Sequence, residues 1–267
     1  MRKLTLALAA AAFLVFSILL VGCGGDDEAV GTLEFRANGE DFVREGFVSK
    51  DGWSISFDHV YIVLSDVAAY QTDPPYDPES SGGLEAEVEV KLDGVHTVDL
   101  AAGGENAPPI LVGQVQDVAV GHYNAISWKM VKASSGAAAG YSLVIVGTAD
   151  KDDQSIAFSI KVEQEYEYSC GDYVGDVRKA IVQEDGTADL EMTFHFDHLF
   201  GDADTPLSDE LNLGAVGFDP FADIAAGGEL DEDLAGLQAK LSSEDYQAMV
   251  DILPTLGHVG EGHCHCD

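Results

Sequence analysis

The sequence predicts a mainly β fold, either an antiparallel β-sandwich or an open barrel, with a short helical segment near the C-terminus. Three observations predict it. Apolar and polar residues alternate in short segments between residues 31 and 200, as they do in half-buried strands. Glycine and aspartate gather in the turns between these segments. After Asp202 the apolar residues are spaced three or four apart, which is typical of amphipathic helices.

We expect eight or nine strands before residue 200, because apolar residues alternate within each segment. The Asp93-Gly94 pair between two alternating runs predicts a hairpin. His59 shares an apolar strand face with Trp53 and Ile55, so we expect it in the core. The expected strand segments are Gly31–Arg36, Trp53–Tyr70, Glu85–Leu92, Val95–Leu100, Val115–Lys132, Tyr141–Thr148, Gln154–Tyr168 and Thr187–Phe200.

Two helices are expected in the C-terminal part, within the sequences DEDLAGLQAKL and SSEDYQAMVDIL. Ser242 or Ser243 can cap the second helix, because a serine hydroxyl accepts a hydrogen bond from a free backbone amide. Glu244 and Asp245 then lie in the first turn, where the helix dipole favours negative charge. Pro254 is expected to end this helix.

Residues 1–22 read as an export signal, in which two basic residues precede an apolar run. The sequence LVGC, which ends at Cys23, resembles the lipobox of bacterial lipoproteins, where the cysteine is lipidated and becomes the new N-terminus. An uncleaved anchor is the alternative, since the run is nearly long enough to cross a bilayer. We therefore expect a protein of the bacterial cell envelope, on the periplasmic side or at the outer membrane and cell surface, tethered to the membrane through lipidated Cys23.

The chain thus divides into four expected parts. Residues 1–22 are a signal peptide of the lipoprotein type, and residues 23–30 are a polar tether. Residues 31–200 form the antiparallel β domain. Residues 201–267 form a helical segment and a His- and Cys-rich tail that pack on the β domain.

The exported part of the chain is strongly acidic. The whole chain has a formal net charge of −35, and because Arg2 and Lys3 precede Cys23, the part from Cys23 onward carries −37. Nucleic acid and anionic lipid surfaces are excluded as partners, because both require clustered Lys and Arg. Two interpretations stay open, namely an acidic surface suited to salty surroundings or a field that attracts cations.

The segment Met192–Asp202 (MTFHFDHLFGD) contains half of a candidate metal site. On a strand, His195 and Asp197 share the outward face, and His198 lies where the strand ends. Imidazole suits Zn, Cu and Ni, and a carboxylate can bind the ion or orient a histidine. The alternative is that His198 is buried and hydrogen-bonded, while His195 is solvated.

The C-terminal tail GHVGEGHCHCD supplies the other half. Its residues of metal-binding type are His258, His263, His265, Cys264 and Cys266. The H-x-H and C-x-C spacings are not those of a zinc finger. Instead of a zinc finger within the tail, we expect the tail to bring two ligands to His195 and His198 and to close a four-ligand site for copper or zinc.

The cysteines offer a competing role for the tail. With Cys23 lipidated, three cysteines are left, and thiols outside the cytoplasm tend to oxidise. We expect a disulfide from Cys170 to either Cys264 or Cys266, which would pin the tail to the β domain. Such a bridge closes a long loop and contributes on the order of 4 kcal/mol of stability. The leftover thiol is either a metal ligand or without a role.

Three motifs, HFDHLFGD, GFDPFA and GHVGEGHCH, are similar to those of a group of uncharacterised acidic bacterial lipoproteins. These proteins carry an H-x-D-H-L-F strand end and a G-H-C-H tail after a β domain, and the resemblance covers mainly residues 190–267. It implies no activity. Some members carry an EF-hand-like stretch, but Asp223–Leu234 lacks oxygen ligands at loop positions three, five and twelve, so we expect no EF-hand calcium. The resemblance implies one constellation of histidines: His195, His198, His263 and His265.

The sequence contains no G-x-S-x-G, H-E-x-x-H or P-loop motif, so we do not expect an enzyme. A zinc hydrolase with three ligands and a water is the remaining enzymatic alternative. The favoured hypothesis is a lipid-anchored extracytoplasmic protein that binds copper or zinc. Its competitor is a structural or adhesion-type lipoprotein with no metal, whose tail is clamped by a disulfide and whose cell-envelope partner is unknown. The candidate ligands are His195, His198, His263 and His265, with His258, Asp197 and a free cysteine in reserve.

Overall fold

The computed structural model describes residues 28–80 and 82–267. The expected export signal and the expected lipidation site at Cys23 lie outside the described residues, as does most of the expected tether. Among the helices that are described, none is both long and apolar enough to cross a membrane.

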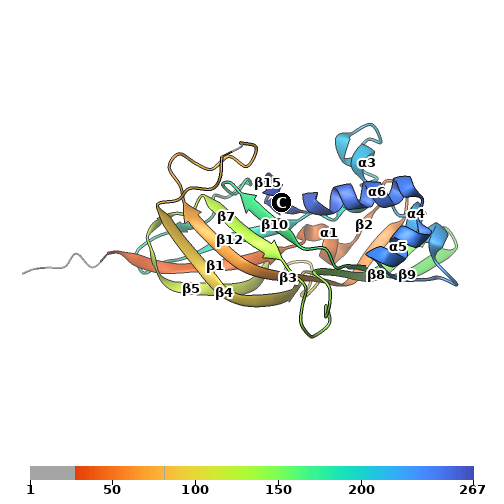
Figure 1. Cartoon of the computed structure of the whole chain (residues 1–267), viewed down its shortest axis with the longest axis horizontal. Helices are drawn as coiled ribbons and strands as arrows, with labels where there is room; N and C mark the ends of the chain where they lie inside the picture. The colour runs from red at the N-terminus through yellow and green to blue at the C-terminus, as the bar shows by residue number, and fades with distance from the viewer. Residues whose placement is uncertain (1–27, 81) are drawn as a thin grey trace, which may run out of the picture.

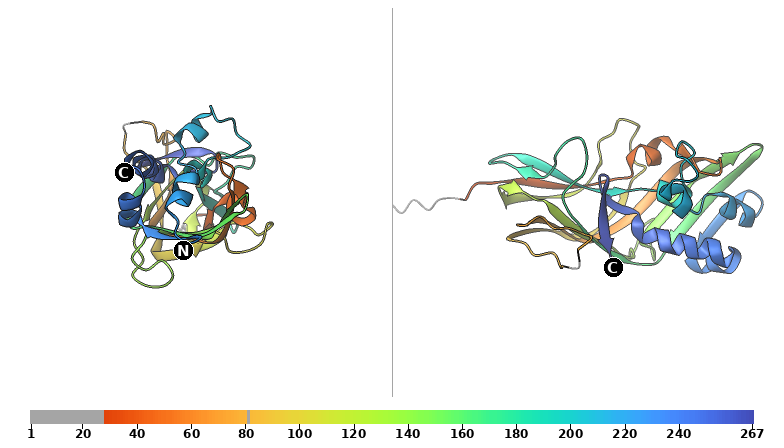
Figure 2. Two further views of the ribbon diagram at one scale, coloured as in Figure 1. Left: turned by 90° about the vertical axis from the view of Figure 1, so that its right-hand side faces the viewer. Right: turned by 90° about the horizontal axis from the view of Figure 1, so that it is seen from above.

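One large sheet forms the body of the molecule and curls into a half-barrel around the core (Figures 1 and 2). Its strands are β1 (Val30–Asn38), β2 (Phe47–Val48), β3 (Ser54–Gln71), β4 (Val88–Asp99), β5 (Ile110–Ala119), β7 (Ala125–Met130), β8 (Leu143–Lys151), β9 (Gln154–Val162), β10 (Tyr166–Cys170), β12 (Thr187–Phe194), β13 (Glu229–Asp233), β14 (Gly257–Val259) and β15 (Gly262–Cys266). Their order is β13-β9-β8-β3-β7-β10-β15-β14-β12-β1-β5, and β2 and β4 pair with β3 off this path. A small separate sheet pairs β6 (Gly121–His122) with β11 (Ile181–Val182).

This architecture confirms the prediction of a mainly β fold with helices near the C-terminus, and the curled sheet matches the open-barrel alternative. Most neighbouring strands are antiparallel, as expected. Two pairs are parallel, however: β1 with β12, and β13 with β9. Both join strands that are far apart in the sequence, and alternation alone does not reveal such pairings.

A bulge in β3 changes the environment of His59. The pairing of β3 with β8 shifts register between Phe57 and His59, and a shift of one residue exchanges the two faces of a strand. Val60 therefore enters the core, while 49% of the His59 side chain is exposed. His59 Nδ1 lies 2.7 Å from a carboxylate oxygen of Asp99. The prediction of a core histidine at this position is wrong.

Two further strand predictions are also wrong. Asp93-Gly94 forms no hairpin, because both residues lie inside the continuous strand β4, at a register shift opposite Asp66. Gly94 has a φ of +108°, so the pair serves as a bulge instead. The expected strand Gln154–Tyr168 breaks at residues 163–165. Its two halves become β9, which pairs with β8, and β10, which pairs with β7.

The C-terminal segment packs on the β domain and also adds β13, β14 and β15 to its sheet. As predicted, the Ser242 hydroxyl caps the second of the expected helices by accepting from the N–H of Asp245. The helical elements are α1 (Glu40–Glu45), α2 (Asp197–Phe200), α3 (Glu210–Gly214), α4 (Asp219–Ile224), α5 (Leu234–Lys240), α6 (Ser243–Ile252) and the 3₁₀ turn η1 (Leu253–Thr255).

An aromatic cluster in the core anchors the segment that carries the candidate site. Phe196 and Phe200, at the two ends of α2, are fully buried. Their rings lie 6.1 and 6.5 Å from that of Phe57, and Phe200 also lies 5.8 Å from Phe218. Such contacts are favourable and directional, so they fix the position of the residues between them.

Candidate metal centre

The end of β12 and the C-terminal hairpin bring distant histidines together. Buried phenylalanines on both sides of His195 turn the chain there, and the His195 side chain lies beneath the tail with only 6% of the residue exposed. Thr193 of β12 faces His258 of β14, and His258 faces His263 of β15. The N–H of Gly260 donates to the Thr193 hydroxyl over 2.9 Å and fastens the hairpin to β12.

Four imidazole rings form what we call the histidine cluster, which comprises His195, His198, His258 and His263. The ring centroid of His258 lies 4.3 Å from that of His195, 4.9 Å from that of His198 and 5.0 Å from that of His263. His195 and His258 are buried, His198 is half-buried and His263 is exposed. The cluster therefore centres on His258, which the sequence placed only in reserve.

Hydrogen bonding decides which nitrogen of His258 carries the proton. Its Nε2 lies 3.0 Å from the backbone carbonyl oxygen of Thr255, which can only accept, so Nε2 carries the hydrogen. Nδ1 then presents a bare lone pair that is buried and has no hydrogen-bond partner among the described residues. A buried polar atom left in this state costs roughly 1–3 kcal/mol. Such an atom in a folded protein calls for an explanation.

The same reasoning applies to His195 and His198. Nε2 of His195 lies 3.2 Å from the carbonyl oxygen of Gly260, so its Nδ1 keeps the lone pair. Nδ1 of His198 lies 3.1 Å from the Thr255 hydroxyl, whose own hydrogen goes to a backbone carbonyl. Nδ1 of His198 therefore donates, and its Nε2 keeps the lone pair. Metal-binding histidines typically donate their second nitrogen in this way.

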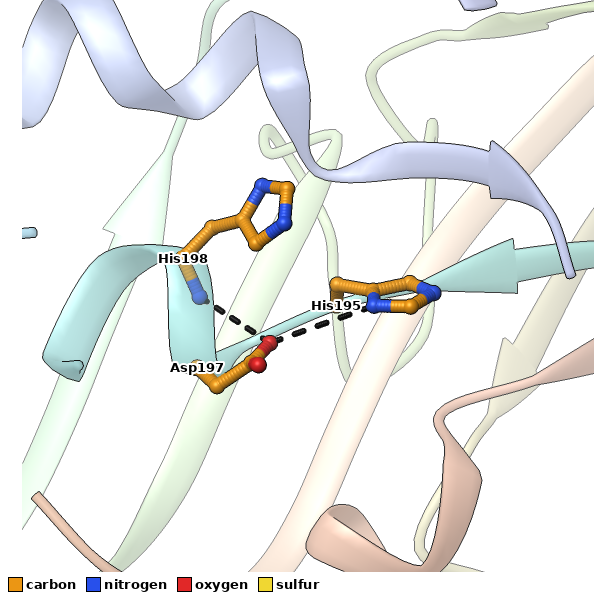
Figure 3. Close-up of side chains that lie close together, drawn as sticks. All are labelled: His195, Asp197 and His198. Carbon is orange, nitrogen blue, oxygen red and sulfur yellow. Dashed lines mark hydrogen bonds and ion pairs between the residues drawn. The ribbon is translucent and has the colours of Figure 1, made fainter. Parts of the chain in front are cut away.

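Asp197 places a carboxylate beside these rings. Its Oδ1 accepts from the backbone N–H of His198 over 3.1 Å and lies 4.0 Å from Nδ1 of His195, as Figure 3 shows. One ligand atom each from His195, Asp197 and His198 lies within 4.8 Å of the other two. A lone pair and a carboxylate repel each other at this separation, whereas a cation between them would be attracted to both.

Burial keeps the centre of the cluster uncharged. Burial, and after it the neighbouring rings of His195, His198 and His263, lowers the pKa of His258 to about 3. Burial also lowers the pKa of His198, although the Asp197 carboxylate opposes this shift. Neutral imidazole is the form that binds a metal. Both side chains are therefore in the metal-binding form at neutral pH.

Two residues near the cluster were not predicted. A carboxylate oxygen of Glu40, in α1, lies 3.8 Å from Nε2 of His195, and burial raises the pKa of Glu40 while His195 opposes the rise. Thr255 contacts His198 through its hydroxyl and His258 through its carbonyl. Thr255 was open to prediction from its place three residues before His258. Glu40 was not, because acidic residues occur throughout the chain.

His265 does not join the cluster. It lies opposite Ser169 of β10, beyond the end of β14. Its side chain is 51% exposed, and Nε2 lies 3.3 Å from the Asp267 carboxylate. His263, in contrast, belongs to the cluster because it pairs with His258 across the hairpin.

The cysteines of the tail lie in β15, which pairs with β10. Cys170 and Cys264 stand opposite each other in the pairing of β10 with β15 and form a disulfide, with 4.4 Å between their Cα atoms. This confirms the predicted bridge and decides between its two candidates. Cys266 has no disulfide partner within the described part of the chain. Burial raises the pKa of its thiol to about 11, which disfavours the thiolate that a metal would bind.

Comparison with protein-family models, curated proteins and solved structures finds no match for this chain. The likeness to acidic bacterial lipoproteins therefore stays an expectation from short motifs. The functional argument rests on the geometry of the histidine cluster.

Proposed function

We propose that this protein is a lipid-anchored, extracytoplasmic protein that binds copper or zinc through the histidine cluster. The observation that carries the proposal is the buried Nδ1 of His258, which has a lone pair and no partner among the described residues. A bound metal ion supplies the missing partner. It also explains why the fold buries this atom although the burial costs free energy, because unsatisfied buried polar groups occur at functional sites.

The donor set favours these metals over harder cations. His195 and His198 offer nitrogens and Asp197 a carboxylate oxygen within 4.8 Å of one another. The ring of His258, whose Nδ1 is unpaired within the described residues, adjoins both histidines. Imidazole ligands suit zinc and copper, whereas calcium and magnesium prefer oxygen ligands throughout. His263 is the reserve ligand, because its ring adjoins His258 at the exposed side of the cluster.

The location follows from separate observations. The lipobox-like LVGC sequence supports a lipid on Cys23. The Cys170–Cys264 disulfide is compatible with an oxidising compartment outside the cytoplasm. The net charge of −35 raises the local concentration of cations around the molecule.

Metal content tests the proposal directly. The protein would be expressed from its full sequence without a histidine tag, extracted from the membrane fraction and purified by anion exchange, which its acidity permits. We expect one equivalent of copper or zinc by mass spectrometry. Changes to the hydrogen-bond partners of metal ligands weaken metal binding by roughly 10–100-fold. The variant His258→Asn removes a proposed ligand itself, so its metal affinity should fall by more than this.

His265→Asn is the matched control, because His265 belongs to the same tail but lies outside the cluster. It should keep the metal. Retention of full affinity by His258→Asn would contradict the proposed centre. Absence of metal after reconstitution with both ions would favour the structural alternative, in which the Cys170–Cys264 bridge makes the tail a clamp and nothing more.

A further inference from the structure

The histidine cluster borders a cavity that the metal site alone does not explain. The cavity has a volume of about 630 Å³, which lies within the range of roughly 300–1,000 Å³ typical of small-molecule sites. His198, His258 and His263 form one part of its wall. A bound metal ion needs only a few cubic ångströms beyond its ligands, so the remaining volume is available to another occupant.

The rest of the wall is mainly apolar. Leu211 of α3, Ile252 at the end of α6 and Pro254 of η1 line it, together with the Cys264 sulfur of the disulfide and the Cys266 thiol. The Cys266 thiol is protonated near neutral pH, because burial raises its pKa to about 11. Glu210, which is exposed, is the only carboxylate among the lining residues.

The cavity therefore has two unlike parts: histidine side chains of the cluster at one side and mainly apolar residues around the remainder. Ligand sites commonly combine apolar walls with a few polar groups that orient the ligand. A ligand with one electron-pair donor and an apolar body matches both parts of the wall. A donor atom placed beside His198 would lie at the edge of the proposed metal centre, because His198 both lines the cavity and shares that centre with His195 and Asp197.

Charge narrows the class of ligand. The chain carries −35, and the Glu210 carboxylate stands at the cavity, so an anionic head group would be repelled on approach. A cationic head group has no free electron pair to offer to a metal. A neutral donor avoids both difficulties.

We propose that the cavity binds a neutral, mainly apolar small molecule whose donor atom coordinates the metal of the histidine cluster. The inference rests on the proposed metal-binding function and deepens it, since the protein would then hold a metal and an organic ligand together. Apolar contacts with α3 and η1 supply the affinity, and the metal fixes the orientation.

The test uses Co²⁺ as a spectroscopic stand-in for zinc and a series of 1-alkylimidazoles from methyl to hexyl as probes. The full-length protein, purified in a mild detergent, is loaded with Co²⁺, and its visible absorption is titrated with each probe at pH 8. We expect the affinity to rise by about fourfold for each added methylene until the cavity is full. Hexanoate, which has a similar chain and a negative head, should bind more weakly than hexylimidazole.

Leu211→Gln and Leu213→Gln form a matched pair in the same helix. Leu211 lines the cavity, whereas Leu213 does not line it and is 69% exposed. Leu211→Gln should reduce the gain in probe affinity for each added methylene, and Leu213→Gln should leave this gain unchanged. Both variants are measured in the same detergent as the parent protein. Both variants should bind Co²⁺ as the parent protein does.

Two results overturn the inference while the metal site stands. Equal affinity for methyl- and hexylimidazole in the Co²⁺-loaded parent protein would show that the cavity takes no apolar body. Hexanoate binding as tightly as hexylimidazole would refute a neutral ligand. Failure of the protein to bind Co²⁺, zinc or copper at all would instead refute the proposed function, and this inference with it.

Discussion

Removal of the Cys170–Cys264 disulfide should cost this protein a large part of its stability. The bond joins β10 to β15 across 94 positions of sequence. In the chain-entropy treatment, a cross-link over a loop of this length restricts the unfolded chain by roughly 4–5 kcal/mol at 25 °C. Whole domains are stable by only about 5–15 kcal/mol. We expect the double variant Cys170→Ala, Cys264→Ala to lose about that amount of unfolding free energy.

Equilibrium urea unfolding of the metal-free protein, followed by tryptophan fluorescence, measures the change. Trp128 reports on this region because its ring stacks on Tyr168 of β10 at 5.1 Å between centroids. Cys266→Ser is the control, since it removes a thiol from the same strand and leaves the bridge in place. A loss below about 1 kcal/mol in the double variant would refute the reasoning. It would show that the pairing of β10 with β15 holds the tail without the bond.

Three further outcomes follow from the cluster and its turn. Folding lowers the pKa of His258 from 6.5 to about 3. Below pH 6.5 the unfolded chain therefore binds a proton at this histidine that the folded chain does not bind. The free energy of unfolding should fall by up to about 1.4 kcal/mol per pH unit from pH 6.5 toward 3. Urea unfolding of metal-free His258→Asn should lack that contribution; parallel pH profiles would contradict the assigned burial. Thr255→Val removes the hydroxyl that accepts a hydrogen bond from His198, so it should weaken metal binding roughly 10–100-fold. Competition with a chelator measures this affinity, and the stability of the metal-free variant checks that it folds. Gly260→Ala (φ +59°) would place a methyl group against a backbone carbonyl, whereas Gly136→Ala (φ +86°) would place one in open space. Gly136→Ala bears only the roughly 1–2 kcal/mol cost of a left-handed backbone, so Gly260→Ala should unfold at a lower urea concentration. Equal unfolding midpoints would show that the turn at Gly260 relaxes.

The faces of individual strands were predictable from alternation, but bulges were not. Leu190, Met192 and Phe194 are buried in the core as their spacing predicts, but β12 ends at Phe194. The expected strand to Phe200 is wrong, and His195 and Asp197 are buried instead of sharing an outward strand face, because α2 begins at Asp197. At His59 the same pattern failed, because a register shift depends on the partner strand and leaves no mark in the strand's own sequence. The parallel pairing of β1 with β12 is likewise a tertiary choice.

The residue types of the candidate site were predictable from the sequence, but which histidines lie together was predictable only in part. His195 and His198 lie together as expected, and His263 adjoins them through His258. The tail was expected to deliver His263 and His265, which share one face of a strand. It folds instead as a hairpin with a short first strand, so that His258 takes the central place and His265 extends past the end of β14. Hairpin register depends on where the turn forms, and Gly260 sets it here with a φ of +59°.

The parallel pairing of β1 with β12 sets how far the histidine cluster lies from Val30, where β1 begins. β1 begins at Val30, and its far end, Asn38, lies beside Thr193, two residues before His195. At about 3.3 Å per residue, the length of β1 separates the two ends by roughly 25 Å. With the proposed lipid on Cys23, β1 would act as a spacer, because the histidine cluster lies at the end of this strand that is remote from Val30.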